Sequence, residues 1–297
     1  MSIKIFGQEI PLAVSYCQLN GKQDNTPKPP GVNLYVRMTN FCQANCRFCI
    51  WKNNEKPGMF NEDRFYFMLS HISKTVQINK VSFTGGEPTI FNRVLNRYLK
   101  MTKELLPDAF TVVSTNGYGI NDDVEEKYVD SFAVSRHGIT WEDNVGIFNT
   151  PHLPRDEWFE QFKHKDKVHI TCNLMRGGID TPEKAYQFIC RYGNMGYSDF
   201  GFVTLMPVND FTRSHRIRIS NGQNSIDLSK MPNTITPLRW SQGDKCACNN
   251  YIVRTTRGDL VRVYARETID SNRCEGILVY DVDRLRIGFN GEVLYGE

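Results

Sequence analysis

Strand-length apolar runs alternate with helical patterns along residues 33–207, and this alternation constrains the fold more than any other feature of the sequence. The six runs are NLYVRMT, KVSFTG, FTVVST, SFAVS, VHITCNLM and DFGFVTLMP. Parallel neighbouring strands need a long connection, which is usually a helix, so six strands with helices between them predict a parallel sheet. We therefore expect an α/β protein built on a partial (β/α)6 barrel.

The helices are predicted from the spacing of apolar residues. Phe65, Met68, Leu69 and Ile72 recur at i, i+3, i+4 and i+7, which places them on one face of a helix over residues 62–73. The same spacing predicts a helix over residues 181–194, and we expect others at 91–106, after the third strand and near 155–163.

The sequence divides into three parts. Residues 1–31 predict a hairpin that turns at Gly7, followed by a polar loop, and residues 32–207 contain the alternating core. Residues 208–297 begin with a polar stretch and continue with two hairpin patterns, around Arg257-Gly258 and Asn290-Gly291. We expect this last part to form a small β-rich C-terminal extension.

The bulk composition is that of an ordinary globular protein, with 40% apolar and 23% charged residues. A net charge of +3 does not indicate a nucleic-acid partner, because such proteins concentrate basic charge on one face. No apolar run reaches the ~18 residues that cross a bilayer, and the N-terminus lacks the apolar centre of a signal peptide. We expect a cytoplasmic protein with neither a membrane nor a nucleic acid as partner.

Three of the nine cysteines stand together in CQANCRFC, at Cys42, Cys46 and Cys49. They follow the first core strand, at the edge of the sheet where parallel α/β proteins carry their sites. A structural zinc site takes four protein ligands, whereas three thiolates leave one iron of a [4Fe–4S] cube open to another ligand. Spacing alone also allows buried cysteines or a zinc site completed from elsewhere in the chain.

The cysteine motif resembles the cluster motif of the radical S-adenosylmethionine (SAM) superfamily. Three further stretches follow successive strands, as in that superfamily: SFTGGEPT (82–89), VVSTNG (112–117) and FAVSRHG (132–138). Taken singly, the glycines of the first two stretches are also ordinary turn residues. The resemblance implies that Cys42, Cys46 and Cys49 hold a [4Fe–4S] cluster and that SAM binds beside it.

The resemblance also implies roles for residues around the cofactors. Gly85, Gly86 and Glu87 would hold the methionine end of SAM, Ser114 and Asn116 would face its ribose, and Phe48 would pack near adenine. The complete set of expected SAM-binding residues is Phe48, Gly85, Gly86, Glu87, Pro88, Ser114, Asn116, Ser135, Asn173 and Arg176.

Arg136, His137 and Arg176 are candidate catalytic residues, because each stands near the carboxyl end of a predicted strand. The Arg176 guanidinium is suited to pair with a carboxylate or phosphate. A structural role for Arg136 and His137, and a surface position for Arg176, are equally compatible with the sequence.

Residues 168–207 resemble more narrowly the GTP 3′,8-cyclase of molybdenum-cofactor biosynthesis and its relatives with a twitch-type extension. The cyclase binds a second cluster through three cysteines of its extension. Here Cys246 and Cys248 are spaced more tightly than in the cyclase, and Cys274 is the remaining candidate for the third ligand. We expect a relative of the cyclase and not the cyclase itself, whose extension either holds a second Fe–S cluster or is a degenerate remnant with free thiols.

The resemblance implies a radical SAM enzyme that reductively cleaves SAM to a 5′-deoxyadenosyl radical and abstracts hydrogen from a substrate in a biosynthetic pathway. A low-potential donor such as flavodoxin or ferredoxin would supply the electron. Arginines late in the chain favour an anionic small molecule, such as a nucleotide, phosphosugar or carboxylate, unless they only solvate strand faces. The alternatives are a peptide-modifying radical SAM maturase and a non-catalytic Fe–S or zinc-binding sensor or scaffold.

Overall fold

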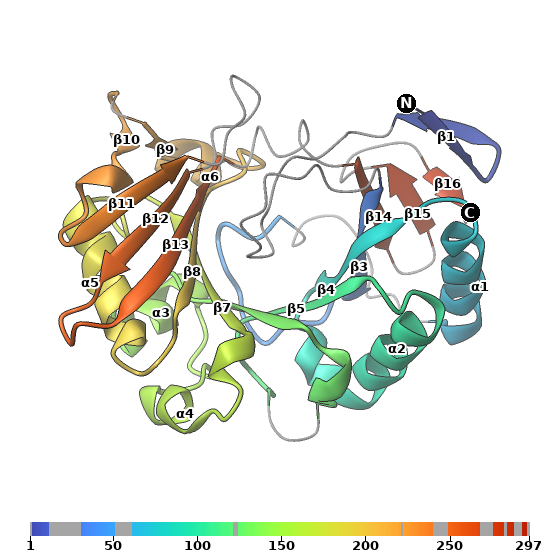
Figure 1. Ribbon diagram of the computed structural model, residues 1–297, viewed down its shortest axis with the longest axis horizontal. Helices are drawn as coiled ribbons and strands as arrows, with labels where there is room; N and C mark the ends of the chain where they lie inside the picture. The colour runs from blue at the N-terminus through green and yellow to red at the C-terminus, as the bar shows by residue number, and fades with distance from the viewer. Residues whose placement is uncertain are drawn as a thin grey trace.

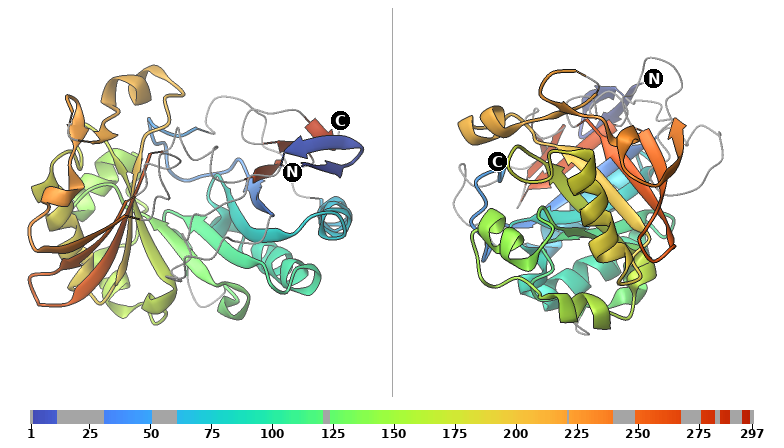
Figure 2. Two further views of the ribbon diagram at one scale, coloured as in Figure 1. Left: turned by 45° about the horizontal axis from the view of Figure 1, so that its top comes forward. Right: turned by 90° about the vertical axis from the view of Figure 1, so that its left-hand side faces the viewer.

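One large sheet forms the centre of this computed structural model, which describes residues 2–11, 31–50, 61–120, 124–220, 222–239, 249–267, 276–281, 284–287 and 293–295. Within these ranges the sheet has 12 strands in the order β11-β12-β13-β8-β7-β6-β5-β4-β3-β14-β15-β16. The strands form an arc, with helices along its outer side (Figure 1). The two turned views in Figure 2 show the same arrangement.

The six central strands run parallel in chain order and are connected by helices. The strands are β3 (Val32–Thr39), β4 (Ile78–Gly85), β5 (Phe110–Thr115), β6 (Ser131–Ser135), β7 (Val168–Leu174) and β8 (Asp199–Thr204). The helices between them are α1 (Glu62–Ser73), α2 (Asn92–Leu105), α3 (Trp141–Phe148), α4 (Asp156–Gln161) and α5 (Pro182–Gly193). Short 3-10 turns are η1 (Pro88–Phe91), η2 (Glu126–Tyr128) and η3 (Lys165–Lys167). The predicted α/β partial barrel is confirmed.

The predicted apolar stripes attach the helices to the sheet. All four stripe residues of α1, from Phe65 to Ile72, are fully buried. The ring of Phe65 meets Tyr98 of α2 edge-on, at a centroid distance of 4.6 Å. In α5 the side chain of Thr181 accepts a hydrogen bond from the backbone N–H of Lys184 and so caps the first turn.

The segment between β5 and β7 differs from the prediction. Where a short acidic helix is expected after β5, the described residues 116–120 and 124–130 contain only the single turn η2, and the structure adds α3 after β6. Helix α3 has apolar residues at Trp141, Val145 and Phe148, with i, i+4 and i+7 spacing, and Thr140 and Asp143 form a capping box at its start. Such a box is a local sequence signal for a helix N-terminus, so the sequence carries two signals for α3 that the prediction did not use.

The C-terminal residues extend the same sheet at both edges. β12 (Asn249–Arg254) and β13 (Leu260–Arg266) form a hairpin around the predicted Arg257-Gly258 turn, and β13 pairs in parallel with β8. β14 (Gly276–Asp281) pairs in parallel with β3 at the opposite edge. The outer strands are β11 (Thr234–Arg239), β15 (Arg284–Ile287) and β16 (Val293–Tyr295). The Asn290-Gly291 turn lies outside the described residues.

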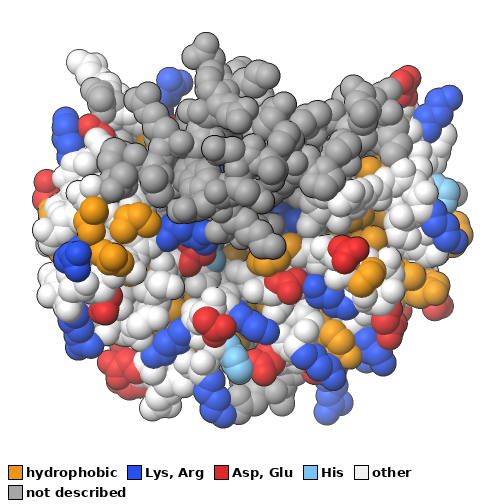
Figure 3. Space-filling model, viewed as in Figure 1, with side chains coloured by type: hydrophobic (Ala, Val, Ile, Leu, Met, Phe, Trp, Pro, Cys, Tyr) orange, Lys and Arg blue, Asp and Glu red, His pale blue; other side chains and the backbone are white. Residues whose placement is uncertain are grey.

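The remaining elements are small. β1 (Ser2–Ile5) and β2 (Gln8–Pro11) form the predicted N-terminal hairpin, in which Gly7 has a φ of 82°. α6 (Asp210–His215), η4 (Leu228–Lys230) and the short pair β9 (Arg218–Ile219) and β10 (Ser225–Ile226) follow β8. Among the described residues, none of the helices has the length and apolar character needed to cross a bilayer. On the face seen in Figure 3, basic and acidic side chains are interspersed.

Candidate functional site

A cavity of about 340 Å³ lies at the carboxyl ends of the parallel strands. It collects residues that are far apart in the sequence but end neighbouring strands, as expected for a parallel sheet. The predicted site residues that line it are Cys42, Cys46, Phe48, Cys49, Gly85, Gly86, Glu87, Ser114, Asn116, Ser135, His137 and Asn173. Pro88, Arg136 and Arg176 are not among its lining residues.

The glycine-rich loop after β4 packs directly against the chain that leads into the cysteine loop. The backbone N–H of Gly86 donates to the carbonyl of Thr39, and that of Glu87 donates to the carbonyl of Phe41 at 2.7 Å. A Cβ atom on Gly86 would lie 2.0 Å from the Phe41 oxygen. Gly85 has a φ of 123°, a conformation that favours glycine. Both glycines are therefore required by the backbone geometry beside Cys42.

The cysteine loop is also held from the side of α3. The backbone N–H of Asn45 donates to the carbonyl of Phe148 at 2.9 Å, and the Cys46 thiol lies 3.8 Å from the same oxygen. The loop is thus fixed between the end of β4 and the end of α3.

Glu87 is buried, with only 1% of its surface exposed. Its Oε1 accepts hydrogen bonds from the hydroxyls of Thr89 and Thr115, both at 2.7 Å, and its Oε2 accepts one from the backbone N–H of Asn116, also at 2.7 Å. Burial raises the pKa of the Glu87 carboxyl, and these hydrogen bonds oppose that shift. The carboxyl group therefore connects the loop after β4 to the end of β5.

Asn116 contacts the cysteine loop with its side chain. Its Oδ1 accepts from Nε2 of Gln43 at 2.9 Å, and its Nδ2 lies 3.9 Å from Sγ of Cys42. Its backbone carbonyl accepts from Nη1 of Arg136 at 2.6 Å. The predicted ribose-facing residue thus also positions the first cysteine.

His137 forms part of an aromatic wall of the cavity. Its ring stacks on Phe148 at 4.8 Å and meets the ring of Phe48 edge-on at 4.9 Å. Its Nδ1 accepts the backbone N–H of Asn173 at 3.0 Å, which assigns the ring proton to Nε2. Burial lowers the pKa of His137 to about 3, so the imidazole is neutral at physiological pH.

Asn144 of α3 holds the backbone at His137. Its Oδ1 accepts the backbone N–H groups of His137 and Gly138, at 2.7 and 3.1 Å. Its Nδ2 donates to the carbonyls of Gly138 and Thr140, at 2.9 and 2.7 Å. One buried amide therefore fixes the turn after β6.

The structure places Arg136 and Arg176 away from the cavity. Arg136 is 2% exposed; its Nη1 donates to the carbonyls of Asn116 and Ser135, and its guanidinium lies 4.6 Å from the ring centroid of Phe159. These hydrogen bonds hold the backbone at the ends of β5 and β6 from the side away from the cavity. The same backbone oxygens and the aromatic face stabilise the buried charge. Arg176 is exposed and donates to the side chain of Asn224. Pro88 is buried as the first residue of η1.

The three cysteines provide the donor set expected for the cluster. Cys42, Cys46 and Cys49 are free thiols on one loop and border one cavity. Burial raises the pKa of Cys42 to about 11. Among the described residues, no three cysteine, histidine or acidic side chains are gathered closely enough to hold a metal ion. Three free thiols on one loop are the ligands that such a cluster needs. In this conformation their sulfur atoms are not close enough to one another to share a metal centre. Cys246, Cys248 and Cys274 lie outside the described residues.

Several residues of the site have little signal in the sequence. Thr89 and Thr115 bind Glu87, and Phe148 forms the aromatic wall, but each has a side chain common in strands and helices. Asn144 directly follows Asp143, the second residue of the capping box at the start of α3, so that box marks its position in the sequence.

Comparison with known proteins gives distant relatives of one kind. No protein-family model matches the chain. A probable GTP 3′,8-cyclase of Saccharolobus islandicus is 25% identical over 186 residues, which cover 60% of this chain and 58% of the relative. The GTP 3′,8-cyclase of Nautilia profundicola is 30% identical over 95 residues, which cover 30% of this chain and 29% of the relative. The match thus spans less than two thirds of these relatives.

Among solved structures, SuiB of Streptococcus suis bound to S-adenosylmethionine has a TM-score of 0.50 and 17% sequence identity, and the match covers 61% of this chain and 42% of SuiB. This likeness shows the fold. The partial barrel places the three cysteines at the border of one cavity, as the sequence resemblance leads us to expect. The relatives and the shared fold support a resemblance to the radical SAM superfamily, and not to the GTP 3′,8-cyclase in particular.

Proposed function

We propose that this protein is a radical SAM enzyme that removes a hydrogen atom from an anionic small molecule in a biosynthetic pathway. The observation that carries the proposal is the cavity that gathers the cysteine loop, the glycine-rich loop and the ends of β5, β6 and β7. When bound, a [4Fe–4S] cluster and SAM supply a 5′-deoxyadenosyl radical, chemistry that no side chain provides.

The residues of the chain have distinct tasks in this proposal. Cys42, Cys46 and Cys49 hold the cluster. The backbone of Gly85 and Gly86 binds the methionine end of SAM, and Glu87 fixes that loop to the end of β5. Ser114, Ser135 and Asn173 face the nucleoside from their strand ends. The aromatic wall of Phe48, His137 and Phe148 gives an apolar surface that excludes water from the reacting atoms.

The remaining partners follow from this chemistry. We include a low-potential electron donor such as flavodoxin or ferredoxin, because the reaction consumes one electron. We also include a cytoplasmic location, where thiols remain reduced. A second cluster on Cys246, Cys248 and Cys274 stays a prediction.

A peptide substrate is the alternative for the same chemistry. SuiB has also been crystallised with its precursor peptide SuiA, in a structure with a TM-score of 0.50 and 18% identity to this chain. That identity supports a common fold alone. A non-catalytic Fe–S or zinc protein is the alternative from another class, and it predicts no SAM cleavage.

The decisive experiment compares Cys46→Ala with Cys190→Ala after anaerobic reconstitution. Cys190 is a buried cysteine of α5 outside the cavity and serves as the matched control. With dithionite and SAM, the wild type and Cys190→Ala should form 5′-deoxyadenosine, and Cys46→Ala should form none. Undiminished 5′-deoxyadenosine in Cys46→Ala, or a wild type that binds no iron, would refute the proposal.

A further inference from the structure

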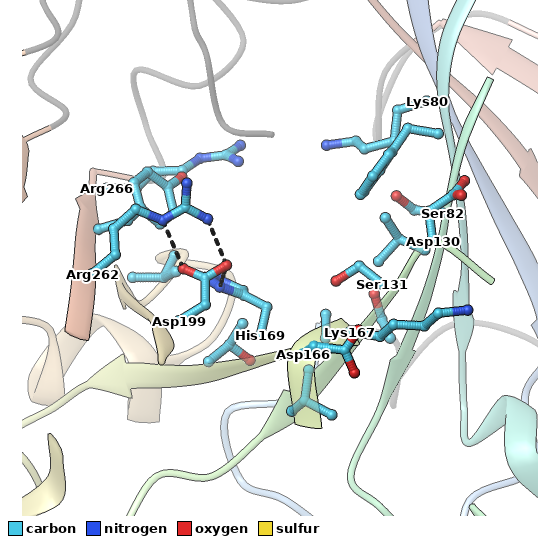
Figure 4. Close-up of a pocket in the computed structure, with 18 of the residues that line it drawn as sticks. Lys80, Ser82, Asp130, Ser131, Asp166, Lys167, His169, Asp199, Arg262 and Arg266 are labelled. Carbon is cyan, nitrogen blue, oxygen red and sulfur yellow. Dashed lines mark hydrogen bonds and ion pairs between the residues drawn. The ribbon is translucent and has the colours of Figure 1, made fainter. Parts of the chain in front are cut away.

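Strand β13 forms one wall of a second cavity, the inner cavity of about 370 Å³, which Arg262 and Arg266 line. Near the start of the strand, the Arg262 guanidinium donates from Nε to Oδ1 of Asp199 on β8 at 3.1 Å and from Nη2 to Oδ2 at 2.7 Å (Figure 4). Nδ1 of His169 lies 3.1 Å from the same Oδ2. Burial alone would raise the pKa of Asp199, but His169 and Arg262 outweigh it and lower that pKa to about 2. The ionised carboxylate therefore holds the start of β13 against β8.

A second carboxylate, that of Glu267, attaches the other end of β13. Glu267 directly follows the strand and is buried, with 8% of its surface exposed. Its Oε2 accepts hydrogen bonds from the Thr204 hydroxyl at 3.1 Å and from Nη2 of Arg216 at 3.0 Å, and its Oε1 accepts the backbone N–H of Ile219 at 2.6 Å. One side chain thus joins the end of β13 to the end of β8 and to the chain that follows β8.

The chain that follows β8, residues 205–219, contains helix α6 and is called the α6 segment. At its start, Leu205 and Met206 line the cavity that borders the three cysteines, the cofactor cavity. Near its end, the carbonyl of His215 accepts the backbone N–H of Arg176, which follows β7, at 2.9 Å. The α6 segment therefore runs beside the cofactor cavity, at the carboxyl ends of β7 and β8.

The α6 segment also contacts the cysteine loop, at Arg47. Nδ2 of Asn209 donates to the Arg47 carbonyl at 3.1 Å, and the Arg47 guanidinium lies 4.6 Å from the ring centroid of Phe211. A cation over an aromatic face is attracted by the negative charge of that face. Oδ1 of Asn209 accepts the backbone N–H of Thr212 at 2.8 Å and so caps α6. The contact to the cysteine loop is therefore built into the first turn of this helix.

Arg47 lies within the turn that carries two of the three thiols. It stands between Cys46 and Cys49, and the backbone N–H of Cys49 donates to the Cys46 carbonyl at 3.3 Å across that turn. A hydrogen bond to the Arg47 carbonyl therefore restrains the backbone of both cysteines. A continuous series of contacts runs from Glu267 through the α6 segment to this turn.

We propose that Glu267 is a positioning residue for the cysteine loop: its carboxylate holds the α6 segment, and the α6 segment holds the turn at Arg47. The charge of Glu267 matters because a neutral side chain would leave the largely buried guanidinium of Arg216 without this counter-charge. The role in positioning follows from these contacts alone, whereas an effect on iron retention rests on the function proposed above.

Two isosteric variants compare the two ends of β13. Glu267→Gln removes the charge at the end of the strand, and Asp199→Asn, the matched control, removes the charge at its start. Asn209→Asp is an independent probe, because aspartate still caps α6 but has no N–H for the Arg47 carbonyl. It remains informative if Glu267→Gln does not fold. Hydrogen–deuterium exchange of residues 42–50 is measured by mass spectrometry on the full chain, and iron retention against a chelator is measured on anaerobically reconstituted samples.

We expect the amides of residues 42–50 to exchange roughly three- to tenfold faster in Glu267→Gln and Asn209→Asp than in the wild type, the range for one lost hydrogen bond. Asp199→Asn should keep the wild-type exchange rate in this loop. The first two variants should also release iron faster than the wild type.

Unchanged exchange of the loop in either variant when it is folded, or an equal acceleration in Asp199→Asn, would overturn the proposal. A wild type that takes up no iron would count against the proposed function instead, and the exchange rates would still decide the role of Glu267.

Discussion

Replacing Gly86 with alanine tests whether the glycine-rich loop positions the cysteine loop. The new Cβ would lie 2.0 Å from the Phe41 carbonyl oxygen, whereas ordinary contact begins at 3.4 Å. The two backbones would have to separate by about 1.4 Å, the difference between these distances. Neither side can yield through a side-chain rotation, because the clash is with main chain next to Cys42.

The expected cost follows from this geometry. Overpacking of this kind destabilises a protein by about 1–3 kcal/mol. Gly146 provides a matched control: it lies within α3, and a Cβ there would meet nothing within 4 Å. Gly146→Ala should stabilise the protein by roughly 0.5–1 kcal/mol, because alanine favours a helix interior.

The assay is urea denaturation of both variants, followed by iron counting after anaerobic reconstitution. Gly86→Ala should lose both stability and iron, and Gly146→Ala should keep its iron. If Gly86→Ala unfolds at the same urea concentration as the wild type and takes up a full complement of iron, the argument that this contact positions Cys42 is wrong.

Three further predictions concern buried polar groups. The pKa of Asp199 is about 2, against 3.8 for an ordinary aspartate, so the ionised carboxylate stabilises the fold by about 2 kcal/mol above pH 4. This stabilisation is lost as the pH falls toward 2. Urea denaturation at several pH values should show the loss, and Asp199→Asn should show a smaller one. The pKa of His137 is about 3, against 6.5 in the unfolded chain, so protonation of the unfolded chain lowers the free energy of unfolding below pH 6.5. The expected loss is about 1.4 kcal/mol between pH 7.5 and 5.5. His137→Gln should lose this pH dependence, and a pH dependence equal to that of the wild type would contradict the argument. Asn144→Ala should cost about 3 kcal/mol in urea denaturation, because it leaves buried backbone groups at His137 and Gly138 without partners, and a loss below 1 kcal/mol would contradict that reading.

The cofactor cavity could be predicted from the sequence because its residues follow strands directly. Once six parallel strands are inferred, their carboxyl ends must meet at one edge, so Cys42, Gly85, Ser114 and Asn173 come together without knowledge of any side-chain contact. The same reasoning fails for Arg136. A charged residue at a strand end suggests a site facing solvent or substrate, but here backbone carbonyls of Asn116 and Ser135 surround its guanidinium.

The inner cavity could not be predicted from local pattern. The contact between Arg262 and Asp199 depends on β13 pairing with β8 in one register, and a shift by one residue would turn Arg262 to the other face of the sheet. Late arginines in the sequence favoured an anionic ligand, but only the pairing of strands separates Arg262 and Arg266, which line the cavity, from Arg254, which is exposed.

The parallel pairing of β3 with β14 has a consequence for how the protein is made. These neighbours come from near opposite ends of the 297-residue chain, so the ribosome releases the first long before it has synthesised the second. Until then the backbone N–H and C=O groups on the outer side of β3 are unpaired, and such an edge strand can pair with another chain and aggregate. Since β3 leads directly into the cysteine loop, that loop lies next to an unpaired strand edge until β14 has been synthesised and has paired.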